Sequence, residues 1–288
     1  MPELPEVETI RRDLERKLVG HKIKDLKILS PKTVALAPAV FYKNLVGQNV
    51  AAVERRAKLL ILKLAPANKY LLVHLKMTGQ LIYQFKGKLI AGGHSLSKEE
   101  FIDLPNRHTR VWFEFADGGR LYFNDLRKFG YLKLVDQVEL DKIIHNNYGF
   151  EPLTSDYTLV NFSSALKNKK TNIKAALLNQ KNIAGLGNIY VDESLFAARI
   201  NPARRADSLK PAELKALFLA SGKIIARAVE FRGTTFNNYL DGDGRKGNFS
   251  KLLKVYGRAN LKCPRCRGLI SKIKLAGRGT HYCPHCQI

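Results

Sequence analysis

The sequence predicts an α+β protein, in which a leading helix and a β-sandwich are followed by a helical region and a small cysteine-rich module. Three observations predict this arrangement. The hydrophobic pattern has a helical period at the amino end, becomes strand-like from Lys22 to about Val135, and is helical again after residue 136. All four cysteines lie in the last 26 residues. The length of 288 residues and the 45% of hydrophobic residues allow two folded domains.

The first element is an amphipathic helix. Its apolar residues recur at steps of three and four: Leu4, Val7, Ile10, Leu14 and Leu18. Pro5 suits the first turn, where the backbone amide has no partner within the helix, and Gly20 ends the helix. Glu3, Glu6 and Glu8 lie at the positive end of the helix dipole, which favours their charged form. On this pattern alone they could be ordinary acids of a helix start.

Short strands follow this helix. Runs typical of strands occupy residues 23–28, 58–64, 70–77, 80–85, 110–115 and 120–123. Asp117-Gly118-Gly119 indicates a hairpin turn between the last two runs. So many short strands in succession predict a β-sandwich or a flattened barrel.

The second half is mainly helical. We expect helices near residues 137–146, 158–168, 173–180, 188–198 and 211–231. Residues 232–250 are rich in glycine and polar residues and indicate a loop. The expected division is therefore 1–135 for the sandwich, 136–150 for a linker, 151–250 for the helices with the loop 232–250, and 251–288 for the cysteine-rich module.

The chain is strongly basic. It has 49 Lys and Arg against 25 Asp and Glu, a formal net charge of +24. Such an excess indicates attraction to nucleic acid or to an anionic membrane surface, although a merely well-solvated surface is the alternative. No apolar run approaches the length of a membrane span, and the acidic, proline-containing start is unlike a signal peptide. We therefore expect a cytoplasmic protein.

The cysteines have the spacing of a structural zinc site. They form a C-x2-C-x16-C-x2-C pattern made of Cys263, Cys266, Cys283 and Cys286. Four thiolates complete a closed tetrahedral shell around one Zn²⁺; His281 and His285 are possible alternative ligands, and two disulfides are the competing interpretation. Residues 251–288 contain nine Lys or Arg and no acid, which favours phosphate contact over a protein-binding module.

The extreme amino end carries a candidate nucleophile. Removal of Met1 would leave Pro2 as the terminus, with a secondary amine of modest pKa that can attack a sugar carbon. Glu3 follows directly as a candidate proton carrier. Glu6 lies three residues later, on the same helical face as Glu3.

Five motifs, in order along the chain, resemble those of the bacterial formamidopyrimidine-DNA glycosylases, which remove oxidised purines from DNA. They are PELPEVET at 2–9, HLKM at 74–77, NDLRKFG at 124–130, AGLGNIY at 184–190 and GRGTH at 277–281. The resemblance spans nearly the whole chain. It implies a β-sandwich, a helix–two-turn–helix domain and a zinc finger, in a monomer that binds double-stranded DNA with oxidised bases or abasic sites between its domains. It also implies association with the bacterial nucleoid.

The resemblance assigns the covalent chemistry. It implies that the Pro2 nitrogen attacks C1′ of the damaged nucleotide and that Glu3 protonates the sugar ring, with Glu6 in support. The resulting iminium acidifies C2′, so that the strand can be cut by elimination. Lys58 matches a family lysine linked to the first elimination, although a phosphate contact is an equal alternative. Arg278 matches an arginine linked to the second elimination, and it could equally clamp a phosphate.

The resemblance also assigns DNA contacts. Met77, Arg127 and Phe129 match residues that fill the gap left by a flipped nucleotide, although Met and Phe in such places are more often core. The further DNA-binding candidates are His74, His108, Lys170, Lys174, Asn188 and Tyr256. For the two lysines the alternative is solvated surface charge. For Asn188 the alternative is that the surrounding glycines serve packing only, and its side chain can also cap the helix start.

The sequence departs from the family pattern at three places, which limits the residue roles that the resemblance can assign. Arg107-His108-Thr109-Arg110 replaces a frequent Lys-His-Asp-His, so the contacts around His108 must differ. Leu126 replaces a frequent proline before Arg127. The loop 232–250 matches the region that covers the flipped base, and this region varies among relatives.

The predicted function is a bifunctional DNA glycosylase and abasic-site lyase for oxidised purines such as 8-oxoguanine and formamidopyrimidines, acting by β,δ-elimination. An endonuclease VIII-like enzyme for oxidised pyrimidines is the first alternative, and Leu4 with the Met77, Arg127 and Phe129 set argues against it. A non-catalytic zinc-containing DNA-binding protein is the second alternative.

Overall fold

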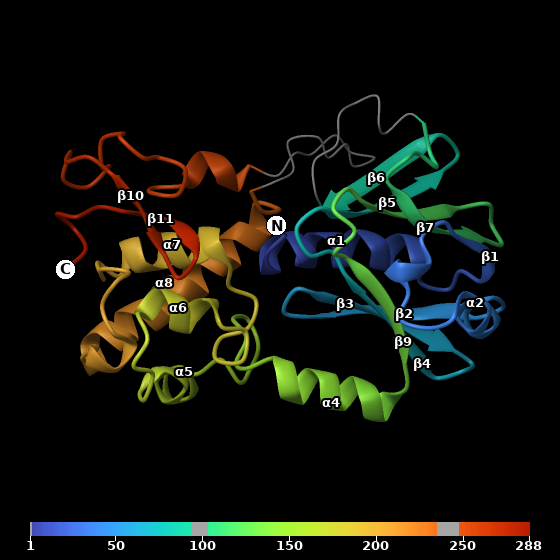
Figure 1. The fold of residues 1–288 in the computed structure, drawn as a ribbon, viewed down its shortest axis with the longest axis horizontal. Helices are drawn as coiled ribbons and strands as arrows, with labels where there is room; N and C mark the ends of the chain where they lie inside the picture. Colours follow the sequence, from blue (N-terminus) through green and yellow to red (C-terminus); the bar gives the residue numbers. More distant parts are fainter. Residues whose placement is uncertain (1, 94–102, 235–247) are drawn as a thin grey trace. The chain divides into compact units, whose positions relative to one another are not determined.

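A computed structural model describes residues 2–93, 103–234 and 248–288. The chain forms two compact units (Figure 1). The first contains the residues up to Ile144, with 232–234 and 248, and the second contains residues 145–231 and 249–288.

The first unit is a sandwich of two antiparallel sheets with a leading helix, α1 (Leu4–Leu18). One sheet has the order β1-β7-β8-β5-β6, with β1 at Ile23–Ile28, β5 at Gly79–Phe85, β6 at Lys88–Gly93, β7 at Thr109–Phe115 and β8 at Arg120–Asp125. The other has the order β2-β3-β4-β9, with β2 at Asn49–Arg56, β3 at Leu59–Ala65, β4 at Lys69–His74 and β9 at Tyr131–Val135. A short helix, α2 (Pro38–Leu45), contacts β1, and α4 (Gln137–Asn147) follows β9.

Helix α1 lies against both sheets, because it contacts β2 and β3 of one sheet and β6 of the other. Its apolar stripe, including Ile10 and Leu14, is buried in the core that the two sheets enclose. The approach to β6 is so close that a Cβ added at Gly92 would lie 2.3 Å from Ile10 Cγ1. The amino end of the chain is therefore anchored on the sandwich by burial of a whole helix face.

The second unit is helical and ends in a hairpin. Its helices are α5 (Leu159–Leu166), α6 (Ile173–Leu178), α7 (Asn188–Ala197) and α8 (Pro211–Glu230), and its strands are β10 (Ser271–Leu275) and β11 (Arg278–Tyr282). Helix α7 packs against α6, α8 and β11. Tyr157 stacks on Phe218 of α8 with ring centroids 4.9 Å apart. The β10–β11 turn, Ala276-Gly277, has both residues at positive φ, the geometry of a tight two-residue hairpin.

The predicted fold class is confirmed, and most predicted helices and strands appear within a few residues of their expected bounds. Besides short 3-10 helices, the α-helix α2 and the strands β2, β6 and β9 were not predicted. The strand expected at 70–77 ends at His74. Helix α4 occupies most of the expected linker, and the cysteine-rich module clusters with the preceding helices. No helix among the described residues is long and apolar enough to cross a membrane.

Candidate active site

The start of α1 holds Glu3 and Glu6 in one hydrogen-bonded unit. Glu3 is the residue that caps α1, and its backbone N–H donates to Glu6 Oε2 at 3.0 Å in a reciprocal capping box. Pro2 is buried, Glu3 is 2% exposed and Glu6 is 1% exposed. The predicted nucleophile and proton carrier therefore lie together in a largely dry site at the positive end of a helix.

The second oxygen of Glu6 binds the segment that follows α8. Glu6 Oε1 accepts hydrogen bonds from the Thr234 backbone N–H at 2.8 Å and from Thr234 Oγ1 at 3.0 Å. Gly233 has φ +80°, and a Cβ there would lie 2.5 Å from Glu6 Oε1. Only glycine suits this close approach. Glu6 thus joins the amino end to the first residues of the predicted loop 232–250, of which 235–247 lie outside the described residues.

Lys58 is placed by a tight turn between β2 and β3. Ala57 has φ +52°, and Arg55 Nη1 donates to the Ala57 carbonyl at 3.0 Å. Arg55 Nε also donates to Glu8 Oε2 at 3.0 Å, so a carboxylate on α1 holds the turn. Burial would raise the pKa of Glu8, but hydrogen bonds from Arg11, Arg12 and Arg55 outweigh it and lower that pKa. Sequence reasoning did not assign this role to Glu8, because its partner is 47 residues away.

His74 is partly buried at the end of β4. Burial, together with the positive charges of Lys76 and Lys58, lowers the pKa of His74 to about 3. Its Nδ1 accepts the Lys76 backbone N–H at 3.0 Å, and its ring lies 5.6 Å from that of Tyr131. Leu59, the residue after Lys58, pairs with His74 in the β3–β4 ladder, so Lys58 and His74 lie at the same end of this sheet.

The predicted gap-filling residues form one exposed cluster. Arg127 Nη1 lies 3.3 Å from Met77 Sδ, and the Arg127 guanidinium carbon lies 4.8 Å from the centre of the Phe129 ring. Met77 is 37% exposed and Phe129 is 55% exposed. The core interpretation of Met77 and Phe129 does not hold, because both project from the sandwich.

Asp125 holds the loop that carries this cluster. Its carboxylate accepts the Gly130 N–H at 2.7 Å and the Arg127 N–H at 3.2 Å, and it also binds the Thr78 hydroxyl. These bonds join the β8–β9 loop to the β4–β5 turn. Arg110 donates to the Asp125 carbonyl at 2.9 Å, which adds a buried contact where the family pattern has histidine. Asp125 therefore fixes the start of the loop that carries Arg127 and Phe129.

His108 is buried at 7% exposure beside Arg107. Arg107 Nε donates to His108 Nε2 at 3.1 Å, and the His108 N–H donates to Asn106 Oδ1 at 2.9 Å. The network around His108 is thus built from arginine.

In the second unit, Lys174 is not at the surface. Its side chain is 0% exposed, and Nζ lies 2.6 Å from Asp192 Oδ1, whose side chain is also 0% exposed. Burial raises the pKa of Asp192 to about 6, although Lys174 and the His281 N–H both lower it. The expected direct phosphate contact of Lys174 is therefore not supported, because its ammonium is enclosed by protein. Asp192 was not among the predicted site residues.

The Lys174–Asp192 pair and Asn188 fix strand β11. Lys174 Nζ donates to the Gly279 carbonyl at 3.3 Å, and Asn188 Nδ2 donates to the same carbonyl at 3.0 Å. Asp192 Oδ2 accepts the His281 N–H at 2.8 Å. Asn188 is the first residue of α7, whereas Gly187 is the cap, so the expected capping role of Asn188 is wrong.

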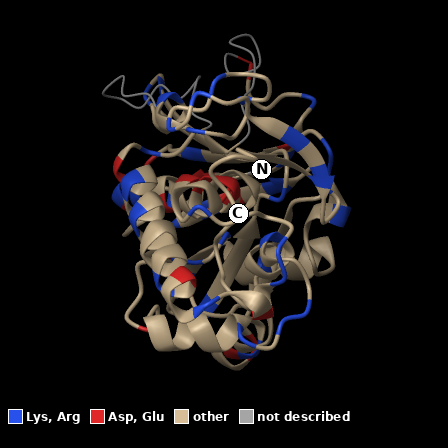
Figure 2. Ribbon diagram, turned by 90° about the vertical axis from the view of Figure 1, so that its left-hand side faces the viewer, with Lys and Arg blue, Asp and Glu red and all other residues tan. Residues whose placement is uncertain are grey.

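Three further candidates lie in this unit. Arg278 is exposed at the start of β11, directly before Gly279. Tyr256 is partly buried, with its ring 5.1 Å from that of His281, and its N–H donates to Glu193 Oε1 at 2.8 Å. Lys170 is exposed between α5 and α6. Lys and Arg recur along the helices, strands and loops of both units (Figure 2).

The four cysteines form a metal site. Their Sγ atoms all lie within 4.8 Å of one another, with Cys266 and Cys283 3.5 Å apart and Cys263 and Cys286 3.9 Å apart. A tetrahedron with Zn–S bonds of about 2.3 Å has edges of about 3.8 Å, so the cluster fits one structural Zn²⁺. The cysteines are free, not disulfide-bonded, and His281 and His285 are not part of the cluster found among the described residues.

Three family models match successive parts of the chain. Residues 1–132 match the formamidopyrimidine-DNA glycosylase N-terminal domain, and residues 148–239 match the H2TH domain of the same glycosylases. Residues 260–288 match a zinc finger found in FPG and IleRS. These matches define a DNA-repair glycosylase class with a helix–two-turn–helix domain and a zinc finger.

Whole-chain relatives agree with the family models. The formamidopyrimidine-DNA glycosylase of Pelotomaculum thermopropionicum is 41% identical over 290 residues, covering 100% of this chain and 99% of the relative. Two crystal structures of the Lactococcus lactis enzyme match with a TM-score of 0.87 and 99% coverage of both chains. One, at 34% identity, is the wild-type enzyme with DNA containing N7-benzyl-Fapy-dG. The other, at 33% identity, is bound to DNA containing an AP site. The chain belongs to the formamidopyrimidine-DNA glycosylase family.

Proposed function

We propose that this protein is a bifunctional DNA glycosylase and abasic-site lyase that removes oxidised purines, including 8-oxoguanine and formamidopyrimidines. The observation that carries the proposal is the buried Pro2-Glu3 terminus at the start of α1, held by Glu6. The relatives named above are glycosylases, and two similar structures contain damaged DNA. A bacterial cytoplasmic location near the nucleoid belongs to the same proposal.

The covalent step begins after Met1 has been removed. The Pro2 nitrogen attacks C1′ as the bond from C1′ to the base breaks, and the proton that the Pro2 amine loses neutralises the departing base. Glu3 then protonates the ring oxygen, so that the bond from C1′ to that oxygen breaks and the sugar ring opens. The product is an iminium joining Pro2 to C1′. Because Pro2 is a secondary amine, the iminium is cationic without further protonation. Its positive charge makes the C2′ hydrogen acidic at neutral pH.

Strand cleavage follows from this iminium. Loss of a proton from C2′ converts the iminium to an enamine, which expels the 3′ phosphate and leaves a conjugated iminium. Loss of a proton from C4′ then expels the 5′ phosphate. We assign Lys58, which is buried directly before β3, to the first elimination on the basis of the family motif. Arg278 is assigned to the second elimination. Since Arg278 lies in the other compact unit, that assignment rests on the family motif.

DNA recognition is assigned to both units. The cluster of Met77, Arg127 and Phe129 would enter the duplex where the damaged nucleotide leaves it, because apolar and guanidinium groups can replace base stacking and pairing. Further DNA contacts are proposed for His74, His108, Lys170, Asn188 and Tyr256. Lys174 is proposed to act indirectly, by holding Gly279 next to Arg278.

Borohydride trapping tests the nucleophile. The processed protein should form a reduced adduct with DNA containing 8-oxoguanine, and mass spectrometry should place the adduct on Pro2. Pro2→Gly keeps a terminal amine but loses the secondary amine, so excision and trapping should fall by about 100-fold or more. An adduct on another residue, or full activity of the variant, would refute the mechanism. Poor excision of 8-oxoguanine with rapid excision of thymine glycol would instead indicate the pyrimidine-specific alternative.

A further inference from the structure

The second unit contains a pocket that the proposed chemistry does not use. It has a volume of about 470 Å³ and lies between α7, α8, the short helix η3 (Phe249–Leu252) and the loop that carries the first two cysteines. Every residue that lines it belongs to this one unit. A volume of this size is within the range of ligand sites in proteins.

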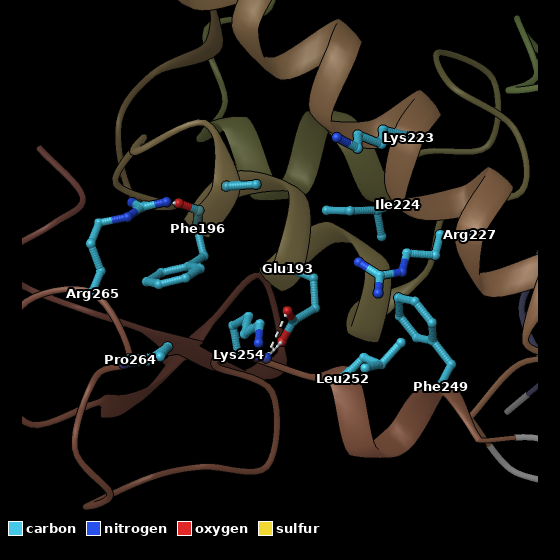
Figure 3. A pocket seen from close by; sticks show the side chains of 11 residues that line it. Glu193, Phe196, Lys223, Ile224, Arg227, Phe249, Leu252, Lys254, Pro264 and Arg265 are labelled. Atoms are coloured by element: carbon cyan, nitrogen blue, oxygen red, sulfur yellow. Dashed lines mark hydrogen bonds between the residues drawn. The ribbon is translucent and has the colours of Figure 1, made fainter.

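The inner surface of the pocket is apolar. Phe196 and Phe249 are each 5% exposed, and Ile224 and Leu252 are partly buried beside them. Figure 3 shows these side chains converging from α7, α8 and η3. The Arg265 guanidinium carbon lies 4.5 Å from the centre of the Phe196 ring, so that ring face is already covered. The pocket therefore suits an inserted apolar side chain better than a stacked base.

The rim of the pocket is basic. Lys223, Arg227, Lys254 and Arg265 line it and are all exposed. Among the residues that the structure describes, none of these four cations has a carboxylate partner within 4.0 Å. Arg265 is nevertheless fixed, because its Nη1 donates to the Phe196 carbonyl at 3.1 Å. Four positive charges around one apolar recess complement a ligand that combines negative charge with an apolar group.

The single acidic residue in the lining does not oppose such a ligand strongly. Glu193 accepts backbone N–H groups from Lys254 at 2.9 Å, Val255 at 2.9 Å and Tyr256 at 2.8 Å. Its carboxylate therefore serves to hold the 254–256 segment against α7, as Figure 3 shows for Lys254. These bonds therefore fix the backbone of the 254–256 segment in the pocket wall.

We propose that this pocket is a docking site for an acidic segment of another protein, with a bulky apolar side chain inserted in the recess and flanking carboxylates bound by Arg227, Lys254 and their basic neighbours. A peptide is favoured over DNA because the apolar groups lie at the bottom of a recess, whereas duplex phosphates follow a continuous outer surface. This proposal does not depend on the glycosylase chemistry.

Fluorescence anisotropy tests the proposal on the full-length zinc-loaded protein. The probe is a fluorescein-labelled peptide, Glu-Asp-Phe-Glu-Asp-Leu, and two control peptides replace its Phe by Ser or its acids by Lys. The acidic Phe peptide should bind, and both control peptides should bind at least about tenfold more weakly. Absence of binding at peptide concentrations up to about 1 mM would overturn the proposal.

Charge reversals locate the site. Arg227→Glu and Lys254→Glu should each weaken peptide binding at least about tenfold, whereas Lys215→Glu, an equal charge change at an exposed position of α8 outside the pocket, should change it less than about twofold. Circular dichroism and zinc content verify the fold of each variant. Arg227→Glu, which lies outside the 251–288 segment expected to contact phosphate, should retain its affinity for a duplex with a stable abasic-site analogue. If the pocket variants lose DNA affinity and the duplex displaces the peptide, the pocket is part of the DNA-binding surface and the proposal is wrong. Equal effects of all three charge reversals on peptide binding would also refute it.

Discussion

Lys174 Nζ lies 2.6 Å from Asp192 Oδ1, and both side chains are completely buried. The pair connects α6 to α7. Through Gly279 and His281 it also connects both helices to the strand that begins with Arg278. A buried ion pair is weak evidence for stability by itself, but removal of one partner leaves an uncompensated charge in the protein interior. We therefore infer that the ion pair positions the end of the β10–β11 hairpin that carries Arg278.

Asp192→Asn should destabilise the second unit by about 3–5 kcal/mol, because the Lys174 ammonium loses its counter-charge. The double variant Lys174→Met with Asp192→Asn should recover a large part of this loss, since no buried charge remains and the Asn oxygen can still accept the His281 N–H. Urea unfolding measures both variants. Additive destabilisation in the double variant would show that the pair is not coupled as the geometry indicates.

The parts of the fold that the sequence predicts are those with strong local patterns. The apolar stripe of α1 and the pattern of α8 are periodic over four turns or more, and both helices were predicted almost to the residue. In contrast, α2 buries only Phe41 and Leu45, and β6 ends in two glycines. The hydrophobic pattern of neither segment distinguishes it from a loop. Their structure is decided by tertiary contacts.

The candidate site divides in the same way. The zinc ligands follow from local spacing, because each pair of cysteines lies on one short turn. The cluster of Met77, Arg127 and Phe129 depends on a contact across 50 residues, and only motif resemblance indicated it. The burial of Lys174 could not be inferred, since its partner lies in another helix and a lysine in a basic sequence resembles a phosphate ligand.

Glu6 should control the reactivity of the amino end. Glu6→Gln replaces one acceptor oxygen with an amide, so it loses a hydrogen bond to the Glu3 N–H or to Thr234. Misplacement of the terminus should lower the single-turnover excision rate by about 10–100-fold with little change in DNA affinity. Thr234→Val, which removes only the hydroxyl donor, is the matched control and should have a smaller effect. Equal rates for Glu6→Gln and the natural protein would disprove this positioning role.

Phe129 should contribute to lesion binding without contributing to folding. Phe129→Ala removes an exposed ring that would stack on a base. Loss of one such stacking contact should weaken binding to an abasic-site duplex by about tenfold. The melting temperature should not change. Leu126→Ala is the control, because Leu126 is 51% exposed on the same loop and is not part of the cluster. A 2-aminopurine base beside the lesion reports the insertion, and an equal fluorescence change in both variants would argue against Phe129 as the wedge.

Protonation of His74 should lower the free energy of unfolding of the first unit in acid. Its pKa is about 3 in the folded protein, below the usual 6.5, so between these values the unfolded chain binds more protons. Stability therefore rises with pH across this window, and up to about 2 kcal/mol is lost between pH 7 and pH 5. His74→Asn cannot titrate but keeps an acceptor for the Lys76 N–H, so its unfolding should depend less on pH. The exposed His145→Asn should keep the natural pH dependence, and identical profiles for all three proteins would contradict the assignment.

Zinc removal should separate the structural role of the cysteines from any disulfide. The protein should contain one zinc ion per chain, and a strong chelator should unfold the β10–β11 hairpin and weaken binding to abasic-site DNA at least about tenfold, because Arg278 loses its support. Added zinc should restore binding, whereas a thiol reductant alone should have no effect. Cys263→Ser should reproduce the chelated state, since serine is a poor zinc ligand. Unchanged DNA binding after verified metal loss would mean that the hairpin folds without its ion, and sensitivity to the reductant would mean that the thiols are cross-linked instead.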